Sequence, residues 1–393
     1  MEASQFAFWA DQESKALQAI RRELHKIPEL ARQEFKTQQY ICDYLERLGV
    51  EYRKVADTGV YAIIRSGKPG RTIALRGDMD GLPIKEETDL PFRSLHEGRM
   101  HACGHDAHMT MLLGAATILS RIKDNLSGNV VFLFQPSEER FGGAERMIKG
   151  GVMDDPRVDA VIGTHVWPLP VGMVVAKAGP LMACPDSFRI TVTGKGGHGA
   201  APHLAVNPII PLSKMVSAIN DISALYVSPL EPVVASVCHI EAGSVYNVIP
   251  DSGYLEGTFR TYDEKVRKRL IDMIEQAVDG IVSAYGVTGE FSLDPICPAT
   301  VNDGPLAEWA FKYLREINPE GQVLDRIEPS MVGEDFSFYG QKVPALFLWV
   351  GVHNEEKGCI YGLHHSRFNL DEEALVIGVR SLCYLAERFT RGQ

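Results

Sequence analysis

The sequence predicts an α/β protein in which a smaller α+β domain is inserted into a larger α/β domain. Three observations lead to this prediction. Short apolar segments typical of buried strands alternate with helical segments in both terminal parts of the chain. Several of these segments end in acidic residues or a histidine. Between residues 183 and 297 the pattern changes to alternating polar and apolar residues, which is typical of a half-exposed sheet.

The N-terminal part of the chain supplies the first helices and strands of the larger domain. Two helices are predicted within residues 13–48, and the second ends on a glycine suited to a C-terminal cap. An alanine-rich helix is predicted over residues 105–121. Four apolar segments are typical of buried strands, namely "VYAII", "RTIALRGDMD", "NVVFLFQPSEE" and "VDAVIGTHVWP". We expect a functional site where the carboxyl ends of these strands meet.

The middle of the chain, residues 183–297, is predicted to form a separate domain with two helices on an antiparallel sheet. Its helices are expected over 206–224 and 263–285, and "DSFRITVTGKGGHG" alternates as a half-exposed strand does. After residue 297 the first pattern returns, with a helix near 304–316, the strand "ALFLWVG" and a final helix over 371–389. The larger domain is therefore assigned to residues 1–182 and 298–393.

Composition narrows the classes of function. The 393 residues carry a formal net charge of −11 without a lysine- or arginine-rich block, so we expect no nucleic-acid partner. We also expect no membrane partner, because the sequence has neither a secretory signal pattern nor an apolar run of about 18 residues. Seven widely spaced cysteines argue against a disulfide framework and favour a reducing compartment, which predicts a cytoplasmic protein.

The stretch "RMHACGHDAHM", residues 99–109, is unusually dense in metal-ligand side chains. If residues 101–105 are extended, His101, Cys103 and His105 face one way, whereas His105 and His108 share a face of the helix that follows. A lone histidine is more often a core or capping residue than a ligand. Four nitrogen and sulfur donors in eleven positions favour a metal site, although not all of them can reach one ion.

Carboxylates at the ends of predicted strands are the next candidates. Asp78 and Asp80 are two apart, so they share a face of a strand. Glu138 and Glu139 are adjacent and point to different sides, an arrangement in which one carboxylate binds metal while the other transfers a proton.

Two further histidine positions complete the set of candidates. His165 ends a third strand-like segment, and "GLHHSRF" offers His364 or His365. Thiolate, imidazole and carboxylate ligands together suit Zn, Ni, Co or Mn, and the sequence does not choose among these metals.

Nine stretches spread over nearly the whole chain resemble the metal-dependent amidohydrolases of the M20 peptidase family: "LRGDMDGLPI", "HACGHDAHM", "FQPSEERFGGAERMI", "GTHVWP", "GKGGHGAAPH", "NVIP", "GTFRT", "GEDFSFY" and "LHHSRFNLDEEAL". The resemblance is greatest to N-acyl-amino-acid amidohydrolases, hippurate hydrolases, N-acetyldiaminopimelate deacetylases and auxin-conjugate hydrolases. It implies a zinc-peptidase-like catalytic domain, with a mixed sheet flanked by helices, and an inserted lid or dimerisation domain.

Carried over position by position, the resemblance implies a site for two divalent metal ions per subunit. Glu138 matches the general base, and Asp80 is expected to hold a ligand in place. In the family, a single histidine is usually followed by a small or polar residue and then by proline. In this chain His364 is followed by His365 and Ser366, and we take His364 as the ligand. The implied ligands are Cys103, His105, Glu139, His165 and His364.

The resemblance also assigns roles to residues of the inserted domain. His198 in "GGHGAAPH" matches a histidine that stabilises the oxyanion and that commonly comes from the neighbouring subunit, so a homodimer or higher homo-oligomer is expected. Asn247 is a plausible second donor. Arg260 has the forked guanidinium suited to a substrate carboxylate.

These assignments predict a hydrolase that cleaves N-acyl-L-amino acids, with N-acetyl, N-benzoyl or similar acyl groups, to a carboxylate and a free amino acid. Glu138 would activate the attacking water. Two alternatives remain at this point. One is a dipeptidase or carboxypeptidase of the same family; the other is a catalytically silent protein that binds amino-acid conjugates, against which the intact set of ligands and Glu138 argues.

Overall fold

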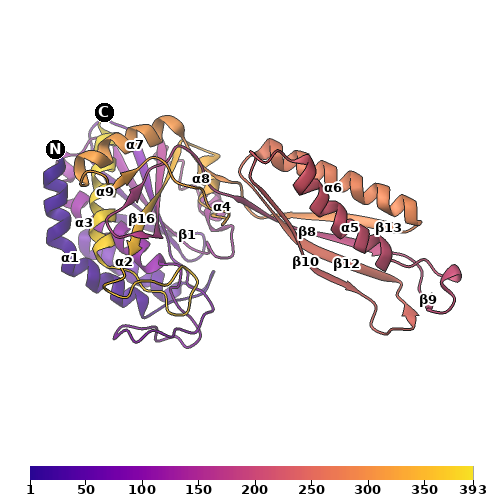
Figure 1. The fold of residues 1–393 in the computed structure, drawn as a ribbon. Coiled ribbons are helices and arrows are strands. Elements are labelled where there is room, and N and C mark those ends of the chain that lie inside the picture. The colour runs from indigo at the N-terminus through magenta and orange to yellow at the C-terminus, as the bar shows by residue number, and fades with distance from the viewer. Residues whose placement is uncertain (393) are drawn as a thin grey trace. The chain divides into compact units, whose positions relative to one another are not determined.

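The computed structural model describes residues 1–392, which separate into two compact units (Figure 1). The first unit comprises Met1–Leu181, Val301–Glu328 and the chain from Asp335 onward; the second comprises Met182–Thr300 and Pro329–Glu334. The sequence-based assignment placed residues 329–334 in the larger domain, whereas here they belong to the second unit. The predicted fold class, a mixed α/β domain with an inserted α+β domain, is confirmed.

An eight-stranded mixed sheet forms the centre of the first unit, in the order β1-β2-β4-β3-β5-β16-β6-β15. Its inner strands β4, β3, β5 and β16 run parallel to one another, whereas β1 and β2 pair antiparallel. Strands β3 and β4 are buried over almost their whole length because both faces of the sheet are covered. The bounds are β1 Glu51–Val55, β2 Gly59–Arg65, β3 Thr72–Asp78, β4 Asn129–Gln135, β5 Ala160–Pro170, β6 Val174–Val175, β15 Val323–Leu324 and β16 Ala345–His353.

Helices cover both faces of this sheet. On one face α3 and α9 pack on β3, and α1 packs on both helices (Figure 1). On the other face Phe336, at the start of α8, packs on Phe347 of β16. A side chain at Gly163 of β5 would collide with the rings of both phenylalanines. The helices of this unit are α1 Ala3–His25, α2 Phe35–Leu48, α3 His105–Arg121, η1 Lys123–Asn125, α4 Gly143–Lys149, α7 Gly304–Ile317, α8 Ser337–Gly340 and α9 Glu373–Thr390.

Helix α1 begins ten residues earlier than the sequence predicted. Phe6 and Ala10 are fully buried, so the apolar stripe that includes Leu17 continues toward the N-terminus. In the part of the chain that the structure describes, no helix combines the length and apolar character needed to cross a lipid bilayer.

The second unit contains a four-stranded antiparallel sheet in the order β10-β12-β8-β13, with α5 and α6 on one face (Figure 1). Leu212 and Leu270 of these helices share a core with Ile190 and Leu255 of the sheet. The main elements are β8 Cys184–Thr193, α5 Ile209–Asp221, β10 Val233–Ala242, β12 Ser252–Thr261, α6 Glu264–Tyr285 and β13 Thr288–Pro295. Shorter elements of this unit are β9 Gly197–His198, η2 Pro202–Leu204, η3 Ile222–Tyr226 and β11 Val248–Ile249. Strands β7 Gly179–Met182 and β14 Thr300–Asn302 pair with each other in a small sheet, and most of their residues belong to the first unit.

Candidate metal centre

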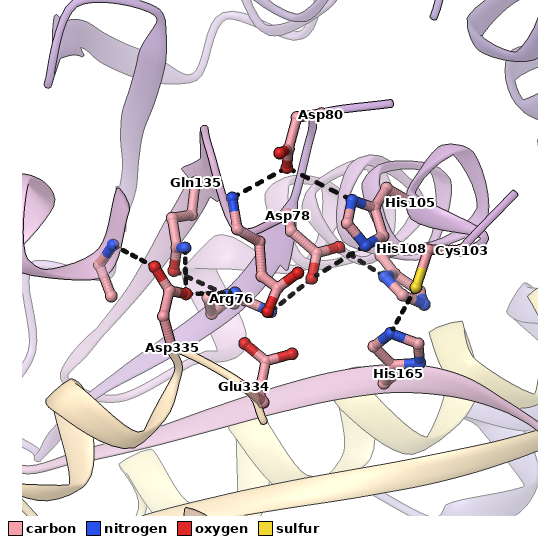
Figure 2. A network of polar contacts seen from close by, with 12 residues as sticks. Arg76, Asp78, Asp80, Cys103, His105, His108, Gln135, His165, Glu334 and Asp335 are labelled. Carbon is pink, nitrogen blue, oxygen red and sulfur yellow. Dashed lines mark hydrogen bonds and ion pairs between the residues drawn. The ribbon is translucent and has the colours of Figure 1, made fainter. Parts of the chain in front are cut away.

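Three adjacent parallel strands of the first unit bring polar residues to one edge of its sheet. Strand β3 ends at Asp78, β4 is followed by Glu138 and Glu139, and β5 carries His165. Helix α3 begins at His105 beside them (Figure 2). Because the carboxyl ends of parallel strands lie at the same edge, residues more than 80 positions apart in sequence meet here.

The turn before α3 depends on a glycine. Gly104 has φ +82°, a conformation that other residues rarely adopt, and it caps the helix. A Cβ atom at this position would lie 2.3 Å from Cγ2 of Val166 on β5. The absence of a side chain therefore lets Cys103 and His105 approach β5 next to His165.

The side chain of Cys103 lies in the middle of the predicted ligands. Its Sγ is 3.4 Å from Nε2 of His165 and 3.3 Å from Nε2 of His364. The same His364 nitrogen is 3.3 Å from Oε1 of Glu139, which lies 3.8 Å from Nε2 of His105. Two groups of donors result, each with its ligand atoms within 4.8 Å of one another, and both contain Cys103: with His105 and His165, and with Glu139 and His364.

His105 has the surroundings expected of a metal ligand. It is fully buried, yet neither ring nitrogen makes a hydrogen bond among the described residues. Its Nε2 is 3.7 Å from Asp78 and 3.8 Å from Glu139, which is too long for a hydrogen bond. Leaving a buried polar group unpaired costs about 1–3 kcal/mol. A cation between these groups would satisfy Nε2, so the donor set fits a divalent metal.

The charges around the cluster also favour a cation. Burial lowers the pKa of His105, but the carboxylates of Asp78, Asp80 and Glu139 outweigh it and raise the pKa to about 10. Burial and the negative charges of Glu139 and Glu138 raise the pKa of the Cys103 thiol well above its ordinary value. Without a metal ion, Cys103 and His105 are therefore both protonated, and they lie among several carboxylates.

Asp80 fixes the turn that carries the two glutamates. Its Oδ1 accepts the backbone N–H of Glu138 and its Oδ2 accepts that of Glu139, each at 3.0 Å. Asp80 Oδ1 also lies 3.5 Å from Nδ1 of His105. This single carboxylate thus contacts both the turn that carries Glu138 and Glu139 and the ring of His105. Such contacts are expected of a group that orients metal ligands.

A buried network behind the cluster was not predicted from the sequence (Figure 2). Arg76 donates to Asp78 at 2.6 Å and to Gln135 at 2.9 Å, and it pairs with Asp335 at 3.2 Å. Asp78 lies 2.5 Å from Nδ1 of His108. The signal in the sequence was a lone arginine inside the apolar strand "TIALRGD", two positions before Asp78 and therefore on the same face.

Charge balance keeps Asp78 ionised. Burial raises its pKa, but the positive charge of His105 and Arg76 and the hydrogen bond with His108 bring the pKa well below its ordinary value. His108 Nε2 accepts the backbone N–H of Val166 at 2.8 Å. This contact requires that Nδ1 carries the proton that faces Asp78. His108 is thereby occupied by protein partners rather than directed at the cluster.

His365 points to different partners from His364. Its ring stacks on Tyr361, with 4.4 Å between ring centroids, and its Nδ1 accepts the backbone N–H of Arg367 at 3.0 Å. His364, whose side chain is 49% exposed, has a positive φ of 64° and contacts Cys103 and Glu139 as described above. The structure therefore places His364, and not His365, among the candidate ligands.

The remaining predicted residues lie in the second unit. His198 on β9 pairs with Val248 on β11, and the carbonyl of Asn247 accepts the backbone N–H of Gly199 at 2.8 Å. His198 and Asn247 are therefore neighbours, and both are exposed. Arg260 is half-buried and donates to the carbonyl of Phe259 at 2.8 Å. The catalytic roles of these three residues remain predictions.

Comparisons with known proteins agree with the motifs. The chain is 41% identical over 377 residues to thermostable carboxypeptidase 1 of Saccharolobus solfataricus, with 94% of each chain covered. It is 38% identical over 370 residues to N-acetylcysteine deacetylase of Bacillus subtilis, with 93% of this chain and 95% of that one covered. A crystal structure from Bacillus subtilis, described as a dinuclear metal binding peptidase from the M20 family, matches with a TM-score of 0.85 and 35% identity, covering 97% and 99% of the two chains.

The family model for peptidase family M20/M25/M40 matches residues 74–388, which include all the candidate residues. The prediction of a hydrolase is thereby confirmed. The chain belongs to peptidase family M20/M25/M40, as its sequence motifs predicted.

Proposed function

We propose that this protein hydrolyses N-acyl-L-amino acids to a carboxylate and a free amino acid, using two divalent cations. The observation that carries the proposal is the pair of donor groups that share Cys103, with Glu138 next to them. The name of the Bacillus subtilis deacetylase supports an N-acyl amino acid as substrate. The proposed ligands are Cys103, His105, Glu139, His165 and His364.

Glu138 is the proposed proton carrier. Bound divalent ions would polarise the scissile carbonyl and lower the pKa of a water molecule. Glu138 is 6% exposed, and its carboxylate lies within 4.8 Å of ligand atoms of His105 and Glu139. In the proposal it takes a proton from the attacking water and returns it to the departing nitrogen.

The second unit supplies the other proposed groups. His198 and Asn247 would donate hydrogen bonds to the oxyanion, and Arg260 would pair with the α-carboxylate of the amino acid. We further propose that the second unit forms a homodimer. Its edge strand β10 has one unpaired side within the four-stranded sheet. The apolar side chains of Leu230 and Tyr246, which precede and follow this strand in sequence, are 90% and 100% exposed.

A carboxypeptidase is the second candidate, favoured by the name of the Saccharolobus relative. The test is the rate of amine release from N-acetyl amino acids, N-benzoyl amino acids and dipeptides, with Zn, Mn, Ni or Co added to chelator-treated protein. The proposal expects the highest kcat/KM on an N-acyl amino acid. Faster cleavage of dipeptides would make the protein a peptidase. Tight binding of N-acyl amino acids without amine release would make it a binding protein.

Metal binding is expected to release protons and to strengthen as the pH rises. At pH 7 the raised pKa values leave both Cys103 and His105 protonated in the absence of metal. Each must lose its proton to bind an ion, so about two protons leave per chain, and the affinity falls as the pH is lowered. Calorimetric titrations in two buffers of different ionisation enthalpy measure this number. Binding without proton release would contradict the assignment of these two ligands.

A further inference from the structure

A second group of buried charges lies in the first unit, outside the ligands described above. It joins Arg21 and His25, on successive turns of α1, to Asp106 in the first turn of α3. All three side chains are at most 1% exposed. Charged groups at such depth are costly to bury unless they are fully paired, and they add little stability on balance. The cluster therefore calls for an explanation other than packing.

The guanidinium of Arg21 hydrogen-bonds to two segments that are far apart in sequence. Its Nε donates to Oδ2 of Asp106 at 3.0 Å. Its Nη1 and Nη2 donate to Glu372 and to Asn369, each at 3.3 Å. His25 supports the first contact, since its Nδ1 lies 2.8 Å from the same Asp106 oxygen. One planar side chain thus spans from the start of α3 to the segment that precedes α9.

Each of the two segments that Arg21 contacts lies next to a proposed metal ligand in the sequence. Asp106 directly follows His105, and Asn369 lies five residues after His364. The two segments also touch through the backbone, because the N–H of His364 donates to the carbonyl of Ala102 at 2.8 Å. His105 and His364 belong to different donor groups that meet at Cys103. The distance between the two segments is therefore expected to determine whether both donor groups can bind an ion at the same time.

We propose that Arg21 is a positioning residue for the metal centre, which holds the His105 and His364 segments at the separation that two adjacent cations need. The proposal rests on the metal site proposed above. It adds that a side chain of α1, whose hydrogen-bond partners are Asp106, Glu372 and Asn369 and none of the proposed ligands, controls the metal affinity of that site. Residues that hydrogen-bond to metal ligands typically change metal affinity by 10–100-fold when they are replaced, and Arg21 is proposed to act in the same way through the neighbouring Asp106 and Asn369.

The test uses Co²⁺ as the probe, because its visible absorption reports ligand geometry. Apparent dissociation constants are measured by competition with a chelating dye for the wild type, Arg21→Gln, Arg21→Lys and Asn369→Ala. We expect Arg21→Gln to weaken Co²⁺ binding by 10–100-fold and to change the spectrum of the loaded protein. Arg21→Lys keeps a charge beside Asp106 but lacks the fork, so its loss should be smaller. Asn369→Ala removes one contact and should weaken binding in the same direction.

The matched control is Arg380→Gln. Arg380 donates to Asn318 at 2.9 and 2.7 Å, a comparable contact within the first unit that involves no ligand-bearing segment. This variant should lose thermal stability yet keep the affinity and spectrum of the wild type. Wild-type affinity and spectrum in both Arg21→Gln and Asn369→Ala would overturn the proposal. If Arg21→Gln does not fold, Asn369→Ala decides alone. Absence of Co²⁺ binding in the wild type would instead overturn the metal site itself.

Discussion

Replacement of Glu138 by glutamine is expected to lower kcat by about 10²–10⁴-fold while both metal ions stay bound. Glutamine keeps the size and hydrogen-bonding shape of the side chain but cannot accept a proton from water. The backbone N–H of residue 138 still donates to Asp80, so the turn that presents Glu139 is preserved. Metal content by elemental analysis and steady-state rates on an N-acyl amino acid measure the two effects separately.

Glu145→Gln is the control for this variant. Glu145 lies nearby in sequence on α4, has a side chain that is 45% exposed, and pairs with Lys149 at the surface. Its replacement removes the same charge and should leave kcat within about twofold, because an exposed ion pair contributes little. If Glu138→Gln retained wild-type kcat with two ions bound, another group would have to carry the proton.

Replacement of Cys103 by alanine is expected to impair both metal positions at once. Cys103 is the one residue shared by the two donor groups, whereas His165 and His364 each belong to one of them. In the proposed site, loss of the thiolate would remove a donor that both groups share, together with its negative charge. We expect binding of the second ion to become undetectable and kcat/KM to fall by at least about 10³-fold, beyond the 10–100-fold typical of residues behind the ligands.

Cys42→Ala controls for the loss of a buried thiol. Cys42 on α2 is also buried, at 1% exposed, and belongs to none of the donor groups found among the described residues. It should bind two ions and turn over at the wild-type rate, with a modest loss of stability. By contrast, His165→Ala and His364→Ala should each weaken mainly one of the two ions. Two ions bound with unchanged affinity in Cys103→Ala would show that the thiol is not a shared ligand.

The parts of the fold that the sequence predicted well are those with a strong local signal. The runs "VVFLF" and "ALFLWV" are long and apolar, and they form β4 and β16 as expected. The start of α1 was missed because its first turns combine a narrow apolar stripe with polar residues. Residues 329–334 fall in the second compact unit, outside the bounds of 183–297 that the sequence predicts for the inserted domain, and so short a segment has no distinctive composition.

Within the site, the sequence predicted the donors that cluster or follow apolar strands, and it also predicted the supporting residue Asp80, whereas the two buried arginines, Arg76 and Arg21, were not predicted. Arg21 is a charged residue of an amphipathic helix, where arginines are normally exposed, and nothing local marks it as buried. Arg21 meets Asp106 across 85 positions and Asn369 across 348. Such pairings depend on the packing of α1 against α3 and α9, which the local sequence does not indicate.

The most direct test of the central claim is a crystal structure of the protein grown with Mn²⁺ or Zn²⁺, with anomalous diffraction used to locate the ions. Two peaks about 3.5–4 Å apart are expected. One should lie within bonding distance of Cys103, His105 and His165, and the other within bonding distance of Cys103, Glu139 and His364. A single peak, or peaks bound by other residues with these five side chains turned away, would contradict the central claim.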